Sequence, residues 1–310
     1  MIMLKRRDFL RNSGAMAIGG LLMKKNIADS FFTGAEIPPA GLQLYTLFNL
    51  MDEDVAGSLK KIAAIGYKEI ESAFSRKGGY YGMSPKEFAA LVKNSGLSWQ
   101  SHHVLGAPFR RPAGARPMTG PDGKPISIPL VKNLKENAQQ LVDEAAEGGV
   151  HYLVCASIPL GKADEIKAAI EILNKTGEAA KKAGITLAYH NHTHEFDTVD
   201  GLIPYEMLLT QTSPDILKFE LDLGWATKAG ADPLELFKKN PGRFPLWHVK
   251  DLDKDTKQPT EVGNGYVDFK RIFSGSETAG LKHFFVEQDG APKPFENIAT
   301  SYNNLKKILA

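Results

Sequence analysis

Histidine, acidic and lysine side chains gather where four β-rich runs in the second half of the chain end. The side chains concerned are His190, Asp222, His248, Lys250 and Glu287. Imidazole nitrogens and carboxylate oxygens are common ligands of divalent cations, which need several of them from different parts of a chain. One such residue alone is more often a structural hydrogen bonder, but four runs that share the feature indicate a divalent metal site. Mn²⁺, Co²⁺, Zn²⁺ and Mg²⁺ are all candidates.

Alternation along a strand decides which of these side chains can face the same way. Lys250 follows His248 by two residues, so the two share a face. The same rule pairs His190 with His192 and Glu220 with Asp222. Two interpretations of Lys250 stay open: it donates a proton or hydrogen bond to a substrate, or it is a strand-end lysine paired with Asp251.

The elements that must position these residues alternate between strands and helices. The runs that predict strands are 41–46, 67–73, 97–104, 152–157, 186–192, 217–223, 244–251 and 283–289. Amphipathic helical patterns lie between them, and several end in Gly before the next run, as in Ile65-Gly66-Tyr67. Eight alternating units predict a closed (β/α)₈ TIM barrel, in which polar residues at the C-terminal ends of strands form the active site. A doubly wound sheet is the alternative, but residues 44–48 lack its Gly-rich phosphate turn.

The first 35 residues have the pattern of an export signal rather than of a folded domain. Paired arginines, Arg6 and Arg7, precede Phe9-Leu10 and a short apolar stretch over 15–23, the order of a twin-arginine signal. The alternative is a basic amphipathic helix. We therefore expect a leader over 1–35, a single catalytic barrel over 36–310 and a periplasmic location. The apolar stretch is far shorter than the ~20 residues of a membrane span, so no stable membrane association is expected.

Composition narrows the class of protein further. The chain has 310 residues, of which 43% are hydrophobic and 24% charged, as in a globular protein with a large core. Residues 1–33 hold six of the 38 basic and two of the 36 acidic residues, which leaves 32 against 34 in the rest. This near-neutral balance argues against a nucleic-acid partner. The lone Cys155 excludes an internal disulfide and a cysteine-based metal site. The oligomeric state stays open, a homo-oligomer included.

Two loop segments each allow a functional and a structural interpretation. Residues 106–129 are rich in Pro and Gly and follow the third predicted strand, so they form either a lid over the site or a solvated insertion. Gly263-Asn264-Gly265 follows the seventh strand. Its backbone N–H groups could cradle a phosphate, although a lone Gly-x-Gly is weak evidence.

Four motifs give the chain a resemblance to a known family. They are Leu-Asp222-Leu-Gly-Trp, Trp-His248-Val-Lys-Asp, Val-Gly263-Asn-Gly265-Tyr-Val-Asp-Phe and Val-Glu287-Gln. In order and spacing they resemble the xylose-isomerase-like barrels called sugar phosphate isomerases/epimerases. That group includes ketose 3-epimerases, inosose dehydratases and, more distantly, endonuclease IV. The resemblance extends over nearly all of residues 40–310.

The resemblance implies a metal held by one residue from each of the last four strands. Three of the family's ligands fall on Asp222, His248 and Glu287. The fourth falls on His190, where the family usually has Glu, and Glu195 is a candidate for the missing carboxylate. The resemblance also implies sugar contacts from strand tips. The candidates are Gln43, Glu71, His103, His192 and Trp225, with structural hydrogen bonding or core filling as the alternative for each.

These assignments imply an enzyme that abstracts a proton α to the carbonyl of a keto-sugar or keto-glycoside. Epimerisation needs two opposed bases, of which Glu287 is one. Elimination needs one base and one acid, for which His190, His192 and Lys250 are candidates. Exported relatives of this kind resemble lyases that act on 3-keto-glycosides. The competing hypotheses are a non-catalytic carbohydrate-binding barrel and an endonuclease IV-like phosphodiesterase.

Overall fold

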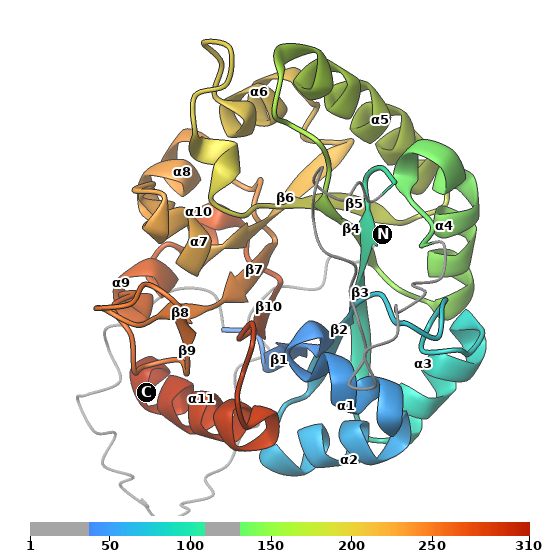
Figure 1. Cartoon of the computed structure of the whole chain (residues 1–310), viewed down its shortest axis with the longest axis vertical. Coiled ribbons are helices and arrows are strands. Elements are labelled where there is room, and N and C mark those ends of the chain that lie inside the picture. The colour runs from blue at the N-terminus through green and yellow to red at the C-terminus, as the bar shows by residue number, and fades with distance from the viewer. Residues whose placement is uncertain (1–36, 109–130) are drawn as a thin grey trace, which may run out of the picture. The chain divides into compact units, whose positions relative to one another are not determined.

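Eight parallel strands form a closed barrel with helices around its outside (Figure 1). The structure, a computed structural model, describes residues 37–108 and 131–310. The strand order around the barrel is β1-β10-β7-β6-β5-β4-β3-β2. The strands are β1 Ala40–Gln43, β2 Glu69–Ser72, β3 Ser98–Leu105, β4 Tyr152–Ser157, β5 Thr186–His190, β6 Leu217–Asp222, β7 Leu246–Val249 and β10 His283–Val286. The predicted (β/α)₈ barrel is confirmed.

The helices follow the strands in the predicted alternation. They are η2 Leu44–Leu47, α1 Phe48–Glu53, α2 Val55–Ile65, α3 Pro85–Asn94, α4 Leu134–Gly148, α5 Ala163–Lys182, η3 His194–Phe196, α6 Pro204–Gln211, α7 Leu223–Lys228, α8 Pro233–Lys239, α9 Phe269–Phe273, α10 Ser276–Ala279 and α11 Pro294–Leu309. Local chemistry sets several of their ends. Ser84 and Glu87 form a reciprocal capping box at the start of α3. Gly66 ends α2 with a positive φ of 127°, a conformation that suits glycine.

The observed strands are mostly shorter than the predicted ones. The fourth matches its prediction, residues 152–157, whereas the fifth ends at His190 instead of His192. After His190 the chain turns, because the His192 N–H donates to Glu195 Oε2 at 2.9 Å and a 3-10 turn begins at His194. Strand alternation therefore does not extend to His192, and the predicted pairing of His190 and His192 on one strand face is wrong.

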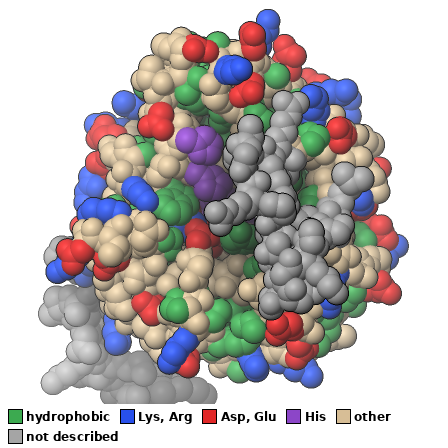
Figure 2. Space-filling model, viewed as in Figure 1, with side chains coloured by type: hydrophobic (Ala, Val, Ile, Leu, Met, Phe, Trp, Pro, Cys, Tyr) green, Lys and Arg blue, Asp and Glu red, His purple; other side chains and the backbone are tan. Residues whose placement is uncertain are grey.

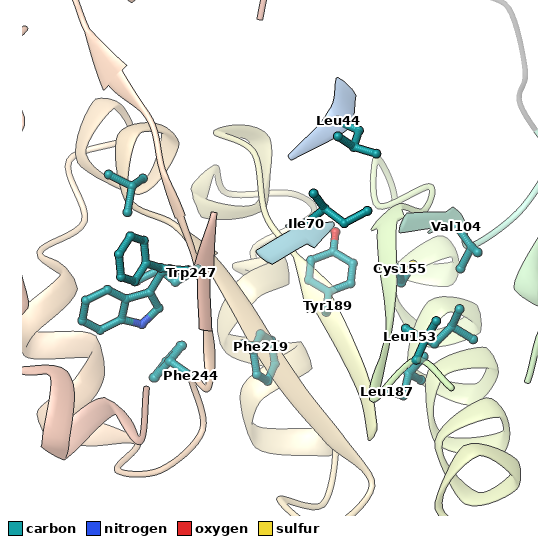
Figure 3. Close-up of a cluster of buried hydrophobic side chains, with 14 of the residues drawn as sticks. Leu44, Ile70, Val104, Leu153, Cys155, Leu187, Tyr189, Phe219, Phe244 and Trp247 are labelled. Atoms are coloured by element: carbon teal, nitrogen blue, oxygen red, sulfur yellow. The ribbon is translucent and has the colours of Figure 1, made fainter. Parts of the chain in front are cut away.

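Alternation along the strands divides the core into an outer and an inner layer. The outward side chains, among them Leu187, Tyr189, Phe219 and Trp247, pack in the large hydrophobic cluster around the barrel (Figure 3). The inward side chains include a separate small apolar cluster of Val154, Ala188, Leu246 and Phe285. Ala188 and Leu246 each precede by two residues an inward histidine, His190 and His248. The barrel interior is thus apolar toward the N-terminal ends of its strands and polar toward the C-terminal ends.

A buried carboxylate after β7 organises the next turn. Asp251 opens a two-stranded antiparallel sheet, β8 Asp251–Leu252 with β9 Pro259–Thr260. Its oxygens accept four backbone N–H groups at 2.8–3.1 Å, from Leu252, Gly263, Gly265 and Val267. A Cβ on Gly265 would lie 2.1 Å from Asp251 Oδ1, so only glycine fits. The phosphate cradle considered for Gly263–Gly265 is therefore wrong, since its N–H groups already bond this carboxylate.

Two of the predicted segments lie outside the described residues. They are the export leader, 1–35, and most of the loop 106–129. Among the residues that the structure describes, no helix is both long enough and apolar enough to cross a membrane.

The Asp251 network gives a test of fold stability. Asp251→Ala leaves four backbone N–H groups without their acceptor, two of them buried and two partly buried, and each buried donor left unpaired costs ~1–3 kcal/mol. We expect the free energy of unfolding to fall by roughly 3 kcal/mol or more. Chemical denaturation followed by circular dichroism measures it. The matched control, Asp215→Ala, removes a carboxylate that is 80% exposed and should leave the transition in place. An unchanged midpoint for Asp251→Ala would contradict the role given to this network.

Candidate metal and substrate site

Four buried side chains converge at the C-terminal end of the barrel. His190 ends β5, Asp222 ends β6, His248 lies in β7 and Glu287 follows β10. These strands are neighbours in the order β5-β6-β7-β10. One ligand atom from each residue lies within 4.8 Å of the corresponding atoms of the other three. We call these four residues the central set, and it brings together three of the expected ligands with His190 as the fourth.

Local hydrogen bonds orient Asp222 within the central set. Asp222 is the N-cap of α7, where its Oδ1 accepts the Trp225 N–H at 2.8 Å. Its own N–H donates to Asn191 Oδ1 at 3.1 Å. The other carboxylate oxygen, Oδ2, is buried and faces the ammonium of Lys250. The cap thus turns one oxygen toward the helix and leaves the other directed into the barrel.

Lys250 is buried and contacts three carboxylates. Its Nζ lies 3.0 Å from Asp222 Oδ2, 2.8 Å from Glu287 Oε2 and 2.7 Å from Asp289 Oδ2. It also lies 4.7 Å from the centre of the Trp225 ring, a cation–π contact. The structure therefore decides between the two interpretations of Lys250: it faces the central set, while the carboxylate of Asp251 serves backbone N–H groups.

Burial and pairing set the protonation of the central set. Burial alone would raise the pKa of Glu287, but Lys250 and His248 outweigh it and hold that pKa well below its usual value. Burial raises the pKa of Asp222 to about 6 although Lys250 opposes the shift. Burial and the neighbouring His248 lower the pKa of His190 well below its usual value. At neutral pH His190 is thus a neutral imidazole, the form that binds a metal.

A second polar layer lies deeper in the barrel and supports His248 from below. His248 Nδ1 contacts Glu287 Oε2 at 2.7 Å, while its Nε2 contacts Glu71 Oε1 at 2.7 Å and Glu220 Oε2 at 3.2 Å. His103 Nε2 bridges the same two carboxylates, at 2.9 Å from Glu71 and 2.7 Å from Glu220. The carboxylates overcome the effect of burial and raise the pKa of His103 to about 9. We call Glu71, His103 and Glu220 the lower layer.

Three of the residues expected to contact a sugar belong to this buried region instead. Gln43 and Glu71 have no exposed surface, and His103 is 8% exposed. Gln43 Nε2 donates to Glu71 Oε1 at 2.6 Å. The structural alternative given for these residues therefore describes them better, because their polar groups bond one another. Trp225 is half-buried and lies beside Lys250, and its contact with a sugar stays a prediction.

Glu195 does not join the central set, contrary to the expectation that it supplies the carboxylate missing at the position of His190. Its Oε1 accepts the Tyr189 OH at 2.8 Å and its Oε2 accepts the His192 N–H at 2.9 Å. It forms a separate group with His192 and His194, whose ligand atoms also lie within 4.8 Å of one another. The bend after β5 carries the carboxylate away from Asp222 and toward these two histidines.

The site contains two acidic residues that were not among the predicted site residues. Glu220 belongs to the lower layer, and its position two residues before Asp222 was the available signal, since the two share a strand face. Asp289 pairs with Lys250, and it follows Glu287 by the same interval. Neither spacing by itself says whether the side chain contacts a metal, a lysine or a histidine.

Comparison with known proteins finds similarity to a curated dehydratase and to a solved sugar phosphate isomerase/epimerase. An inosose dehydratase of Lacticaseibacillus casei is 28% identical over 145 residues, which cover 40% of this chain and 48% of that relative. The match thus spans about half the length of the relative. A sugar phosphate isomerase/epimerase structure from Parabacteroides distasonis is 29% identical with a TM-score of 0.70, covering 88% of this chain and 96% of that one.

More distant structures share the fold alone. The IolI protein, solved with a bound zinc atom, is 16% identical and has a TM-score of 0.62 over 88% of this chain and 96% of its own.

The family model that matches residues 59–307 is described as a xylose isomerase-like TIM barrel. With a closed barrel, this match and the expected motifs in place, the chain belongs to the xylose isomerase-like TIM barrel family.

Proposed function

We propose that this protein is a divalent-metal-dependent enzyme that removes a proton α to the carbonyl of a keto-sugar or keto-glycoside. The observation that carries the proposal is the central set, in which four adjacent strands direct His190, Asp222, His248 and Glu287 toward one point. The similarity to a dehydratase and to a sugar phosphate isomerase/epimerase supports a carbohydrate substrate. Both kinds of relative, by name, act on small molecules.

The residues present suit a divalent ion of the Mn²⁺, Co²⁺, Zn²⁺ or Mg²⁺ class. Asp222 Oδ2 lies 3.0 Å from the Lys250 ammonium, and His190 Nδ1 lies 3.2 Å from Glu220 Oε2, so both atoms belong to a buried group of ligand-type side chains. Two imidazoles and two carboxylates whose ligand atoms lie within 4.8 Å of one another form a donor set of the kind that these ions bind. The charges also favour a bound cation. In the central set, the lower layer and Asp289 together, the carboxylates outnumber the cationic side chains that pair with them. These carboxylates are Glu71, Glu220, Asp222, Glu287 and Asp289, and the cations are His103, His248 and Lys250.

The central set would hold the ion, which supplies Lewis-acid polarisation of the substrate carbonyl when bound. Glu287 is ionised at neutral pH and is the base that accepts the α-proton. The three carboxylates around Lys250 overcome the effect of burial and raise its pKa, so it carries a proton to donate. Trp225 lies beside the Lys250 ammonium at the edge of the central set and would contact the substrate from there.

We propose elimination as the reaction rather than epimerisation. Epimerisation needs a base on each side of the substrate, and His190 stands where the family usually has a second carboxylate. Elimination needs only Glu287 as base and Lys250 as acid: the α-C–H electron pair forms a C=C bond and the β-C–O bond breaks. The leaving oxygen departs as water or an alcohol with a proton from Lys250. A relative named a dehydratase, which by name removes water, supports this choice.

The substrate class follows from the elimination proposal. A 3-keto-glycoside has its α-proton at C2 and a leaving alcohol at C1, so a lyase that acts on it needs no other cofactor. We further propose that the protein acts in the periplasm, on the basis of the Arg6-Arg7-x-Phe9-Leu10 pattern in the leader.

Metal content tests the central set directly. His248→Ala removes one ligand of the central set and should lower the bound Mn²⁺ by one equivalent per chain relative to the unchanged protein. Equilibrium dialysis with elemental analysis measures it on the full chain. His151→Ala, an exposed histidine at the start of β4, is the control and should retain the full content. If His248→Ala binds as much Mn²⁺ as the unchanged protein, the central set is not a metal site.

Leaving-group dependence tests the acid role of Lys250. Lys250→Met should slow elimination of methanol from a methyl 3-keto-glucoside by ~10²–10⁴, since general acid catalysis contributes about that much. It should slow release of nitrophenol far less, because that group departs without a proton. Both rates are followed with Mn²⁺ present, by NMR and by absorbance. Equal loss on the two substrates would contradict the acid role.

Glu287→Gln tests the base. We expect the rate of α-proton exchange in D₂O and the rate of elimination to fall together by at least ~10². The matched control is Glu296→Gln, since the Glu296 side chain is 73% exposed on α11 and pairs with Lys293. Unchanged protein that interconverts free ketoses but leaves 3-keto-glucosides intact would overturn the elimination proposal and favour epimerisation.

A further inference from the structure

A second group of ligand-type side chains lies outside the central set, just after β5. Its members are His192, His194 and Glu195, which we call the mouth triad. One ligand atom of each lies within 4.8 Å of those of the other two. The histidine side chains are 40% and 52% exposed, whereas Glu195 is buried. Figure 2 shows histidine side chains gathered at the surface of the face on which the barrel strands end.

Both imidazoles of the mouth triad direct a nitrogen at the same carboxylate oxygen. His194 Nε2 lies 3.3 Å and His192 Nδ1 lies 4.0 Å from Glu195 Oε1. N–H···O hydrogen bonds are ~2.7–3.2 Å long, so these separations are too wide for good hydrogen bonds. Ligands bound at ~2.0–2.1 Å around a tetrahedral ion lie roughly 3.3 Å apart, and farther apart at wider angles. The spacing therefore suits an ion between the three groups better than direct bonds among them.

A buried nitrogen of His192 without a hydrogen-bond partner also favours an ion between the three side chains. His192 Nδ1 is buried and has no hydrogen-bond partner among the described residues. The His192 side chain packs at right angles on the His190 ring, with 5.0 Å between ring centres, so its position is defined by packing. A buried nitrogen fixed in place without a partner is rare, and a bound ion would satisfy it.

The carboxylate of the mouth triad is held in position from behind. The Tyr189 hydroxyl and the His192 backbone N–H donate to its two oxygens. Hydrogen bonds from the surrounding residues to a ligating carboxylate are typical of protein metal sites, because they fix the ligand before the ion arrives. The Tyr189 side chain comes from the outward face of β5, so this support belongs to the fold and not to the loop alone.

We propose that His192, His194 and Glu195 bind a second divalent ion of the borderline class, Zn²⁺, Co²⁺ or Ni²⁺. Two imidazoles and one carboxylate match the preferences of these ions, while Mg²⁺ and Ca²⁺ prefer oxygen ligands alone. Three protein ligands leave a coordination position open, as in catalytic zinc sites. The site lies beside the central set, since His190 and His192 are in ring contact, and its open position can take an oxygen atom of a substrate or of water.

Zinc stoichiometry of paired variants tests the proposal on the full chain. We expect two equivalents of tightly bound Zn²⁺ per chain for the unchanged protein and one for His194→Ala. His194 is half exposed, so its truncation should leave the fold intact, which a thermal melt checks. His248→Ala should also retain one equivalent, because it removes an ion from the central set and leaves the mouth triad complete. The exposed His151→Ala serves as control and should bind as the unchanged protein does.

The outcomes separate this site from the central set. If His194→Ala binds as much Zn²⁺ as the unchanged protein, the mouth triad holds no ion. If His194→Ala loses one equivalent of Zn²⁺ and His248→Ala loses none, the mouth triad binds an ion and the central set does not. A second variant, Glu195→Gln, should weaken binding of the same ion at least tenfold. If its affinity is unchanged, the histidines alone bind zinc as an exposed pair, and the proposed three-residue site is overturned.

Discussion

The structure of the site depends on the two-sided pairing of the His248 imidazole inside the barrel. One ring nitrogen contacts Glu287 at the level of the central set, and the other contacts Glu71 in the lower layer. His248 and Glu71 have no exposed surface and Glu287 is 5% exposed, so the histidine and both carboxylates are removed from water. A buried charge is tolerated only when it is paired and hydrogen-bonded, and one histidine here links the carboxylates of several strands.

This pairing explains why the barrel interior changes character along its length. The small apolar cluster that includes Ala188, Leu246 and Phe285 excludes water from the N-terminal half. Above it, Glu71 and Glu220 each contact both His103 and His248, so these carboxylates form a buried charged network rather than an open surface. The central set adjoins this network at the C-terminal ends of the strands, where four ligand-type side chains converge.

At the mouth of the barrel, the turn after β5 determines which side chains lie near the central set and which lie apart from it. Had β5 continued, His190 and His192 would face the same way, and Glu195 would lie too far along the chain to matter. The bond between the His192 N–H and Glu195 ends the strand and creates a separate group of ligands. In the same way, the Asp251 carboxylate occupies the N–H groups of Gly263 and Gly265 and leaves Lys250 free to face Asp222. Hydrogen bonds within these turns thus determine which side chains face the central set.

The (β/α)₈ barrel is predictable from the sequence, because hydrophobic periodicity, glycine-ended helices and eight alternating units are all local signals. The position of His190, Asp222, His248 and Glu287 at one end of the barrel is predictable as well, since parallel strands must end at the same edge. The turn that carries Glu195 away, and the contacts of Gln43, Glu71 and His103 inside the barrel, could not be predicted in the same way. Those contacts join strands far apart in the chain, and the stagger of the strands, which no local pattern encodes, determines which side chains share a layer.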